Sequence, residues 1–252
     1  MDNAAVKADP AAQLTLLDLQ GIDSHLDQLR HQRGTLPELA EIASLTASRR
    51  ALDGERVDKQ MVVDDLTTAQ KKADFDVEQV KTRRKRDRDR IDQGLITNPK
   101  DLERLNHELE SLERRISTLE DEELEVMEQL EEAQAALDQV AEKVSAHDER
   151  LAELVASRDA KFAELDRELA AVAEQRDPTA AKVPADLLAL YDKLRASKDG
   201  VGAAELRARE CGGCRLGLDN AEVQRVRGLA DDEVVRCEEC SRILVRTPES
   251  GL

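Results

Sequence analysis

The clearest pattern in the chain is a stripe of apolar residues that recur at alternating steps of three and four positions from residue 102 onward. The members of this stripe are Leu105, Leu109, Leu112, Ile116, Leu119, Val126, Leu130, Ala133, Leu137, Val140, Val144, Leu151 and Leu154. Polar residues interrupt it at Glu123, His147 and Arg158 without shifting its register. A heptad repeat of this length predicts a left-handed coiled coil with one long partner helix.

A looser stripe upstream supplies the partner. It comprises Leu19, Ile22, Leu26, Leu29, Leu45, Leu52, Val62, Leu66, Ala69, Ala73 and Val80. Between the two stripes, residues 93–101 read QGLITNPKD, in which Gly, Asn and Pro end one helix and start another. We therefore predict that the chain reverses at a tip of about residues 93–100 and forms an antiparallel hairpin.

The turn residues predict the register of this hairpin. Asn98 or Thr97 is expected to cap the second helix, and Pro99 to lie in its first turn, where the missing N–H has no cost. A reversal centred near Ile96 places Val80 beside Glu113. The second arm then spans about 75 residues, on the order of 110 Å at 1.5 Å per residue, which predicts a rod.

Prolines mark two further boundaries. Pro37 predicts a helix break near residues 34–37, and Pro178 predicts the end of the second arm, because proline disfavours helix at the preceding residue. Residues 1–177 are therefore expected to form the hairpin. Residues 178–252 would form a short linking helix at 185–195 and then short strands at 201–210, 233–236 and 243–245.

Composition favours long helices over a globular core. The 252 residues include one Tyr, two Phe and no Trp, and 37% are charged. The formal net charge of −17 argues against uniform wrapping of nucleic acid, although a local basic patch can still bind it. No apolar run reaches the length of a membrane span. The first residues, including Asp2, Lys7 and Asp9, lack a signal-peptide pattern, so we expect a cytoplasmic protein without membrane contact.

The four cysteines of the chain form two C-x-x-C pairs, Cys211 with Cys214 and Cys237 with Cys240. Each turn directs two sulfurs at one point, and about 22 intervening residues suffice to return the second turn opposite the first. This spacing predicts one structural tetrathiolate Zn²⁺. Tetrathiolate iron uses the same geometry, whereas a redox C-x-x-C needs only one pair beside a βαβ pattern that is absent here. The expected fold is mainly α, a long antiparallel coiled-coil hairpin with a small C-terminal β zinc ribbon.

A dense basic run close to the tip is the second candidate site. Its members are Lys81, Arg83, Arg84, Lys85, Arg86, Arg88 and Arg90. A helix cannot direct all of them one way, so they wrap its circumference. Antiparallel pairing is expected to bring Glu103, Glu108 and Glu110 alongside, too few carboxylates to neutralise the run. It is therefore a candidate site for RNA, DNA or an acidic protein surface, and the alternative is a solvated, salt-bridged helix.

Arginines near the cysteines, including Arg215 and Arg242, are further candidate contacts to phosphate or to a partner. Acidic residues are equally frequent in this segment, and no aromatic residue follows Tyr191 to stack on a base. The chain offers no catalytic triad and no phosphate-cradling glycine loop, and a zinc ion with four thiolates has no open position for water. An enzyme is therefore not expected.

Together these features resemble a bacterial family of coiled-coil hairpin proteins with a C-terminal C4-type zinc ribbon. The resemblance is carried by Asn98-Pro99-Lys100-Asp101-Leu102, Leu119-Glu120-Asp121, Leu124-Glu125-Val126-Met127-Glu128 and Cys237-Glu238-Glu239-Cys240-Ser241-Arg242-Ile243-Leu244. Ser241 stands where such ribbons usually carry Gly. The resemblance implies a nucleic-acid-binding or adaptor protein linked to transcription, with no catalytic activity.

Two functions stay open at this point. The first is a non-enzymatic nucleic-acid-binding, transcription-linked regulatory protein, whose partner is RNA or DNA. The second is a protein–protein adaptor or chaperone scaffold, whose partner is a transcription-associated or other protein. The apolar stripes are compatible with a monomer or a homodimer.

Overall fold

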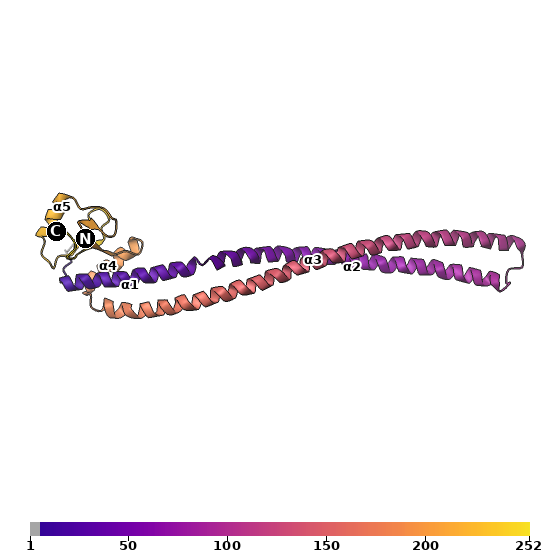
Figure 1. The fold of residues 1–252 in the computed structure, drawn as a ribbon, viewed down its shortest axis with the longest axis horizontal. Coiled ribbons are helices and arrows are strands. Elements are labelled where there is room, and N and C mark those ends of the chain that lie inside the picture. The colour runs from indigo at the N-terminus through magenta and orange to yellow at the C-terminus, as the bar shows by residue number, and fades with distance from the viewer. Residues whose placement is uncertain (1–5) are drawn as a thin grey trace. The chain divides into compact units, whose positions relative to one another are not determined.

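The computed structural model describes residues 6–252, and its helices and strands follow one another as Figure 1 shows. They are α1 (Pro10–Gly34), α2 (Pro37–Asp92), α3 (Pro99–Ala180), α4 (Ala185–Ser197), β1 (Ala203–Arg207), β2 (Glu210–Cys211), α5 (Asn220–Gly228), β3 (Val235–Arg236) and β4 (Ile243–Arg246). The predicted mainly α fold, with long hairpin helices and a small C-terminal β region, is confirmed.

The chain divides into two compact units. Ala40–Val155 forms one unit, and the residues up to Leu39 form the other together with Ala156–Leu252. The predicted division at residues 177 and 178 differs from this one, because α1 and the end of α3 pack with the C-terminal segment. Residues 1–5 of the predicted first segment lie outside the described residues.

In the unit of residues 40–155, α2 and α3 run antiparallel and pair along a heptad seam. Ion pairs link the two helices, including Arg49 Nε to Asp148 Oδ1 at 2.5 Å and Arg84 Nη1 to Glu113 Oε2 at 2.6 Å. Glu113, which the predicted register places beside Val80, pairs with Arg84, and Glu108 pairs with Arg83. Arginine side chains reach residues on either side of the predicted register, and these pairs are compatible with it.

The second-arm seam is as predicted, and the first-arm seam needs two corrections. Ile116, Leu119, Val140 and Val144 are buried. In α2, however, Val63 is buried, and the predicted Val62 and Ala69 are both exposed. A heptad that runs through Val63 directs its apolar positions toward α3 along the whole seam. Val62 lies outside this heptad.

Local turn chemistry explains where the helices start and stop. Asn98 caps α3, since its Oδ1 accepts a hydrogen bond from Lys100 N at 3.0 Å, and Pro99 is the first helical residue. The break between Gly34 and Pro37 is also present. The predicted stop at Pro178 is wrong, because α3 continues through it to Ala180. Proline removes only one hydrogen bond so close to a helix end, and Ala181 N still donates to Asp177 O at 2.9 Å.

The C-terminal strands form one sheet in the order β2-β1-β4-β3. The β1–β2 and β3–β4 pairs are antiparallel, but β1 and β4 are parallel, so the prediction of simple hairpins is only partly correct. The helix α5 between β2 and β3 was not predicted. Its sequence signal is a capping pair, because Asp219 accepts a hydrogen bond from Glu222 N and Glu222 stands three positions later.

Both faces of this small sheet are covered, and alternate residues of each strand point to opposite faces. One face packs against α1 and α4 through Ala203, Ile243 and Val245. The opposite face packs against α5 and two of the cysteines through Leu206 and Leu244. The sheet therefore belongs to two cores at once, one made with helices and one made with the cysteine turns.

A network of polar side chains binds the segment of residues 200–203, which leads into β1, to the neighbouring helices. Gln20 of α1 accepts hydrogen bonds from Gly202 N and Ala203 N at 2.7 and 3.2 Å, and it donates to Gly200 O at 2.9 Å. Gly202 lies against the backbone of Tyr191, where a Cβ atom would meet Tyr191 O at 2.7 Å. The linker near Gly200 is therefore bound to α1 and α4.

Asp23 is the charged centre of the same network. It is 1% exposed, and it accepts hydrogen bonds from the Tyr191 hydroxyl and from Arg176 Nε, both at 2.8 Å. Arg195 lies 3.5 Å away and also binds Asp27. Burial, followed by the bond to Asp23, raises the pKa of Tyr191 well above its usual value, so its hydroxyl stays a donor. One carboxylate thus joins α1, α3 and α4.

Replacing Asp23 tests this arrangement. Asp23→Ala should lower the free energy of unfolding by about 3 kcal/mol, because it leaves two guanidiniums and a hydroxyl without their buried acceptor. The matched control is Asp166→Ala, which removes the exposed Arg33–Asp166 pair and should cost less than about 1 kcal/mol. Denaturant unfolding measures both, and equal losses would contradict the assignment of Asp23 as the centre of the network.

Candidate functional site

The two C-x-x-C turns have the same backbone conformation. Arg215 N donates to Cys211 O at 2.7 Å, and Ser241 N donates to Cys237 O at 2.9 Å. The residue after the second cysteine of each pair has a left-handed backbone conformation, with φ of 61° at Arg215 and 63° at Ser241. Glycine favours this conformation, which explains why Gly is expected at position 241. The turn is accordingly closed by its backbone, and the Ser241 side chain is not needed for it.

These turns bring the four sulfur atoms together. Cys211 Sγ lies 3.8 Å from Cys240 Sγ, and Cys214 Sγ lies 3.8 Å from Cys237 Sγ. All four atoms are within 4.8 Å of one another. Zn–S bonds of about 2.3 Å give a tetrahedron with edges of about 3.8 Å, whereas a disulfide requires about 2.05 Å. The donor set therefore fits one structural tetrathiolate Zn²⁺, as predicted.

The surroundings of the sulfurs differ in a way that matters for metal uptake. Burial raises the pKa of Cys237 to about 12 and also raises that of Cys211. At Cys240, burial also acts to raise the pKa, but hydrogen bonds from Arg242, together with those involving Cys237 and Cys214, outweigh it and lower the pKa to about 7. Zinc must displace protons from the buried pair, so its binding weakens as the pH falls.

Arg242 and Arg215, both predicted as candidate contacts, have different environments. Arg242 Nε donates to Val201 O at 2.9 Å, and its Nη2 donates to Lys198 O at 3.0 Å. Its side chain passes over Gly213, where a Cβ atom would come within 2.7 Å of it. We therefore assign Arg242 to the structure of the ribbon. Arg215 is exposed, and no carboxylate of residues 6–252 lies within 4.0 Å of it.

The basic run of α2 is accompanied by more carboxylates than the sequence indicated. Six of its seven cations have a carboxylate partner among residues 6–252, and Lys85 is the exception. These pairs are Lys81–Glu120, Arg83–Glu108, Arg84–Glu113, Arg88–Asp92, and Arg83, Arg86 and Arg90 with Asp87. Of the three predicted flanking carboxylates, Glu108 alone pairs with the run, and Glu110 pairs with His107 instead.

Asp87 is the residue that sequence reasoning missed. Its side chain is 5% exposed, and it lies 3.9, 3.6 and 3.7 Å from Arg83, Arg86 and Arg90. It occupies a seam position of α2, one turn beyond Arg84, where an apolar residue would be usual. The signal in the sequence is a carboxylate at a heptad position inside a basic run. Three guanidiniums lie near this one charge, and in the described part of the chain Arg83 alone of them has a second carboxylate partner, Glu108, so the cluster keeps a local positive excess.

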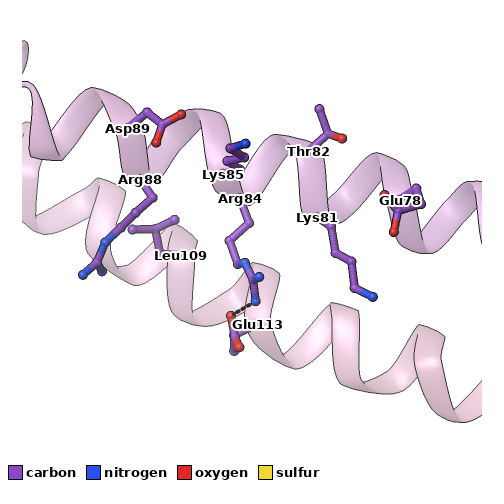
Figure 2. A pocket seen from close by; sticks show the side chains of 9 residues that line it. All are labelled: Glu78, Lys81, Thr82, Arg84, Lys85, Arg88, Asp89, Leu109 and Glu113. Carbon is purple, nitrogen blue, oxygen red and sulfur yellow. Dashed lines mark hydrogen bonds and ion pairs between the residues drawn. The ribbon is translucent and has the colours of Figure 1, made fainter.

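Other members of the run line a groove between α2 and α3, drawn in Figure 2. It has a volume of about 650 Å³, and α3 contributes Leu109 and Glu113 to it. Its cations are Lys81, Arg84, Lys85 and Arg88, which recur at helical spacing along one side of α2. Figure 2 shows Arg84 reaching across to Glu113. The cations thus lie on more than one side of α2, as the sequence predicted.

Comparison with known proteins finds a matching family for each part of the chain. The family of the CT398-like coiled coil hairpin domain matches residues 19–199, and the family of the C4-type zinc ribbon domain matches residues 211–244. Protein Rv2229c of Mycobacterium tuberculosis is 34% identical over 241 residues, which are 96% of this chain and 98% of the relative. Protein ML1638 of Mycobacterium leprae is 28% identical over 222 residues, 88% of this chain and 95% of that protein.

Solved structures give the same fold. A structure from Mycobacterium smegmatis is 34% identical and superposes with a TM-score of 0.83 over 96% of this chain and 100% of its own. CT398 from Chlamydia trachomatis, at 18% identity, has a TM-score of 0.69 over 94% of this chain and 98% of its own. In the part of the chain that the structure describes, we find no helix with the length and apolar character to cross a membrane.

Loss of one thiolate should release the metal. Cys237→Ser is expected to lower the zinc content from one ion per chain to nearly none, because the buried ligand cannot be replaced by a hydroxyl. Amide hydrogen exchange should then rise across β3, β4 and α5, while residues 40–155 keep their protection. Metal analysis and exchange mass spectrometry measure both effects. A variant that retains its zinc would show that the site does not need four thiolates.

Ser241, which follows the second C-x-x-C pair and has a left-handed backbone conformation, is a position where a substitution should stabilise the zinc site. Ser241→Gly should tighten zinc binding by up to about 1 kcal/mol, because glycine removes the Cβ penalty at φ of 63°. Ser241→Ala keeps the Cβ atom and serves as the control, with no expected gain. Competition with a chromogenic chelator compares the three proteins. Equal gains for Gly and Ala would point to the lost hydroxyl and away from the backbone.

Proposed function

We propose that this chain, which belongs to the CT398-like coiled-coil hairpin family and carries a C4-type zinc ribbon, is a non-enzymatic nucleic-acid-binding protein with a transcription-linked regulatory role in the cytoplasm. The zinc ion stabilises the ribbon and takes no part in chemistry. The nucleic acid binds at the cationic end of the hairpin, defined as residues 81–115.

The observation that carries the proposal is the segregation of charge. The cationic end contains eleven Lys and Arg and eight Asp and Glu, a net charge of +3, in a chain whose net charge is −17. Local excess of this kind attracts phosphates while the rest of the surface repels them. Nucleic acid is therefore directed to one region of the chain, and uniform coating of the protein is disfavoured.

The carboxylates at this end support phosphate binding by orienting the cations. The side chains of Arg83, Arg86 and Arg90 are 55, 67 and 51% exposed although all three lie near Asp87. A guanidinium has five N–H donors, and one shared carboxylate cannot occupy those of three arginines. Donors therefore remain for phosphate oxygens, on side chains whose position is already restricted.

The ribbon contributes less to this proposal than the hairpin end. Arg242 bonds to backbone carbonyls, and so does Arg246, through Ala230 O at 2.7 Å and Asp231 O at 3.0 Å. Arg215 remains available for a phosphate contact. We therefore assign the main nucleic-acid interface to Lys81, Arg83, Arg84, Lys85, Arg86, Arg88 and Arg90, with Arg215 as a separate contact.

A protein–protein adaptor is the second candidate, and a different surface favours it. Val57 and Met61 of α2 are 58 and 56% exposed, and with Leu137 and Ala141 of α3 they line a mainly apolar groove of about 470 Å³. Exposed apolar patches on soluble proteins mark sites of protein contact. An adaptor function predicts a partner whose binding survives nuclease treatment and is lost in Met61→Asp.

Charge reversal at the hairpin end tests the main proposal. Lys85→Glu with Arg88→Glu should weaken binding of labelled single-stranded and duplex oligonucleotides at least tenfold at low salt, and should reduce the slope of log K against log[salt] by about 1 to 2. Fluorescence anisotropy at several salt concentrations measures both quantities.

The control is Lys71→Glu with Lys72→Glu, which makes the same charge change on exposed positions of the same helix. The control pair should lose much less affinity. Equal losses in both variants would show that net charge alone governs binding. Absence of binding to any oligonucleotide by the unaltered protein at low salt would refute the proposal and leave the adaptor function.

A further inference from the structure

The chain has three aromatic residues, and two of them have internal roles. Tyr191 is fully buried and donates to Asp23. The ring of Phe162 lies 4.2 Å below the guanidinium carbon of Arg33. Phe75 differs from both, since it is 60% exposed in the middle of α2. Its ring is available to a ligand, and within residues 6–252 no arginine or lysine lies over it as Arg33 lies over Phe162.

Phe75 lies on a side of α2 that α3 does not cover. A shallow, open concavity of about 460 Å³ includes its ring, and all of the lining residues belong to α2. They are Phe75, Glu78, Gln79, Thr82, Arg83 and Arg86. The seam residue Val77, by contrast, is 2% exposed. The concavity is therefore a strip of helix surface about 16 Å long, with the ring at one end and Arg86 at the other.

The chemistry of this strip changes along the helix. From its N-terminal end, the strip presents the ring of Phe75, then the amide of Gln79 and the hydroxyl of Thr82. The guanidiniums of Arg83 and Arg86 lie at its C-terminal end. Those two guanidiniums are among the three that lie close to Asp87, and Arg83 also pairs with Glu108 of α3. Glu78 is the only carboxylate in the lining, and Lys81 follows it by three positions on the same helix. An aromatic face beside oriented cations suits a ligand with both a planar ring and phosphates.

We propose that Phe75 is a base-stacking platform and that the ligand of the hairpin end is single-stranded nucleic acid, with a base on Phe75 and the adjoining phosphates on Arg83 and Arg86. This inference rests on the proposed function and narrows it. In a duplex the faces of the bases are already stacked, so a ring on a helix surface reaches one only after unstacking that costs a few kcal/mol. Single strands present free base faces to aromatic side chains, with little dependence on sequence.

A tryptophan at position 75 tests the stacking directly, because the chain contains no other Trp. The fluorescence of Phe75→Trp should be strongly quenched when a single-stranded oligonucleotide binds, and much less by a duplex of the same sequence. Uridine-rich RNA and thymidine-rich DNA are tested in parallel, which separates the two possible sources of the single strand. Binding with no change in fluorescence would overturn the inference, since it would place the base elsewhere.

Affinity measurements complete the test. Phe75→Ala should weaken single-strand binding about tenfold and leave duplex binding unchanged. Met61→Ala is the matched control, since Met61 is an apolar residue of the same helix with 56% exposure. Loss of affinity in Lys85→Glu with Arg88→Glu but not in Phe75→Ala would overturn the platform and keep the proposed function. A protein that binds neither form of nucleic acid would refute both.

Discussion

The need to bury both faces of a very small sheet is the constraint on which the compact unit that contains the zinc ribbon depends. Its four strands contain two to five residues each, too few to form a core alone. On one face the zinc thiolates and α5 provide the cover, and on the other α1 and α4 do. The ribbon is therefore part of a shared core, and its zinc stabilises residues well beyond the two cysteine turns.

The polar network around Gln20 and Asp23 follows from this shared core. A chain that enters a sheet beneath a helix brings backbone N–H groups into a place without water, where they need acceptors. Gln20 supplies the acceptor for Gly202 and Ala203, and Asp23 satisfies the hydroxyl of Tyr191. Because Asp23, Tyr191 and Arg176 lie on three different helices, the bonds of Asp23 also fix the angle at which those helices meet.

At the end of the hairpin, the seam between α2 and α3 changes from apolar to charged residues. Val77 is buried where α2 pairs with α3, but the later seam positions carry Arg84 and Asp87. Charged residues there give up apolar contact, and the ion pairs that replace it contribute little net stability when exposed. What they add is a set of oriented guanidiniums. The hairpin thus has an apolar middle part that holds it together and a charged end, where we propose that nucleic acid binds.

The sequence by itself determined the elements whose signal is local or periodic. The heptads, the Asn98-Pro99 start of α3, the break before Pro37 and the four zinc ligands all follow from spacing, because helix period and metal geometry act over short distances. The tertiary structure decided what depends on residues distant in the chain. It placed Val63 in the seam in place of Val62, carried α3 past Pro178, paired β1 with β4 in parallel, and engaged Arg242 with the backbone while leaving Phe75 exposed. Each of these outcomes depends on packing partners that lie far apart in the chain, and local spacing and periodicity do not reveal such partners.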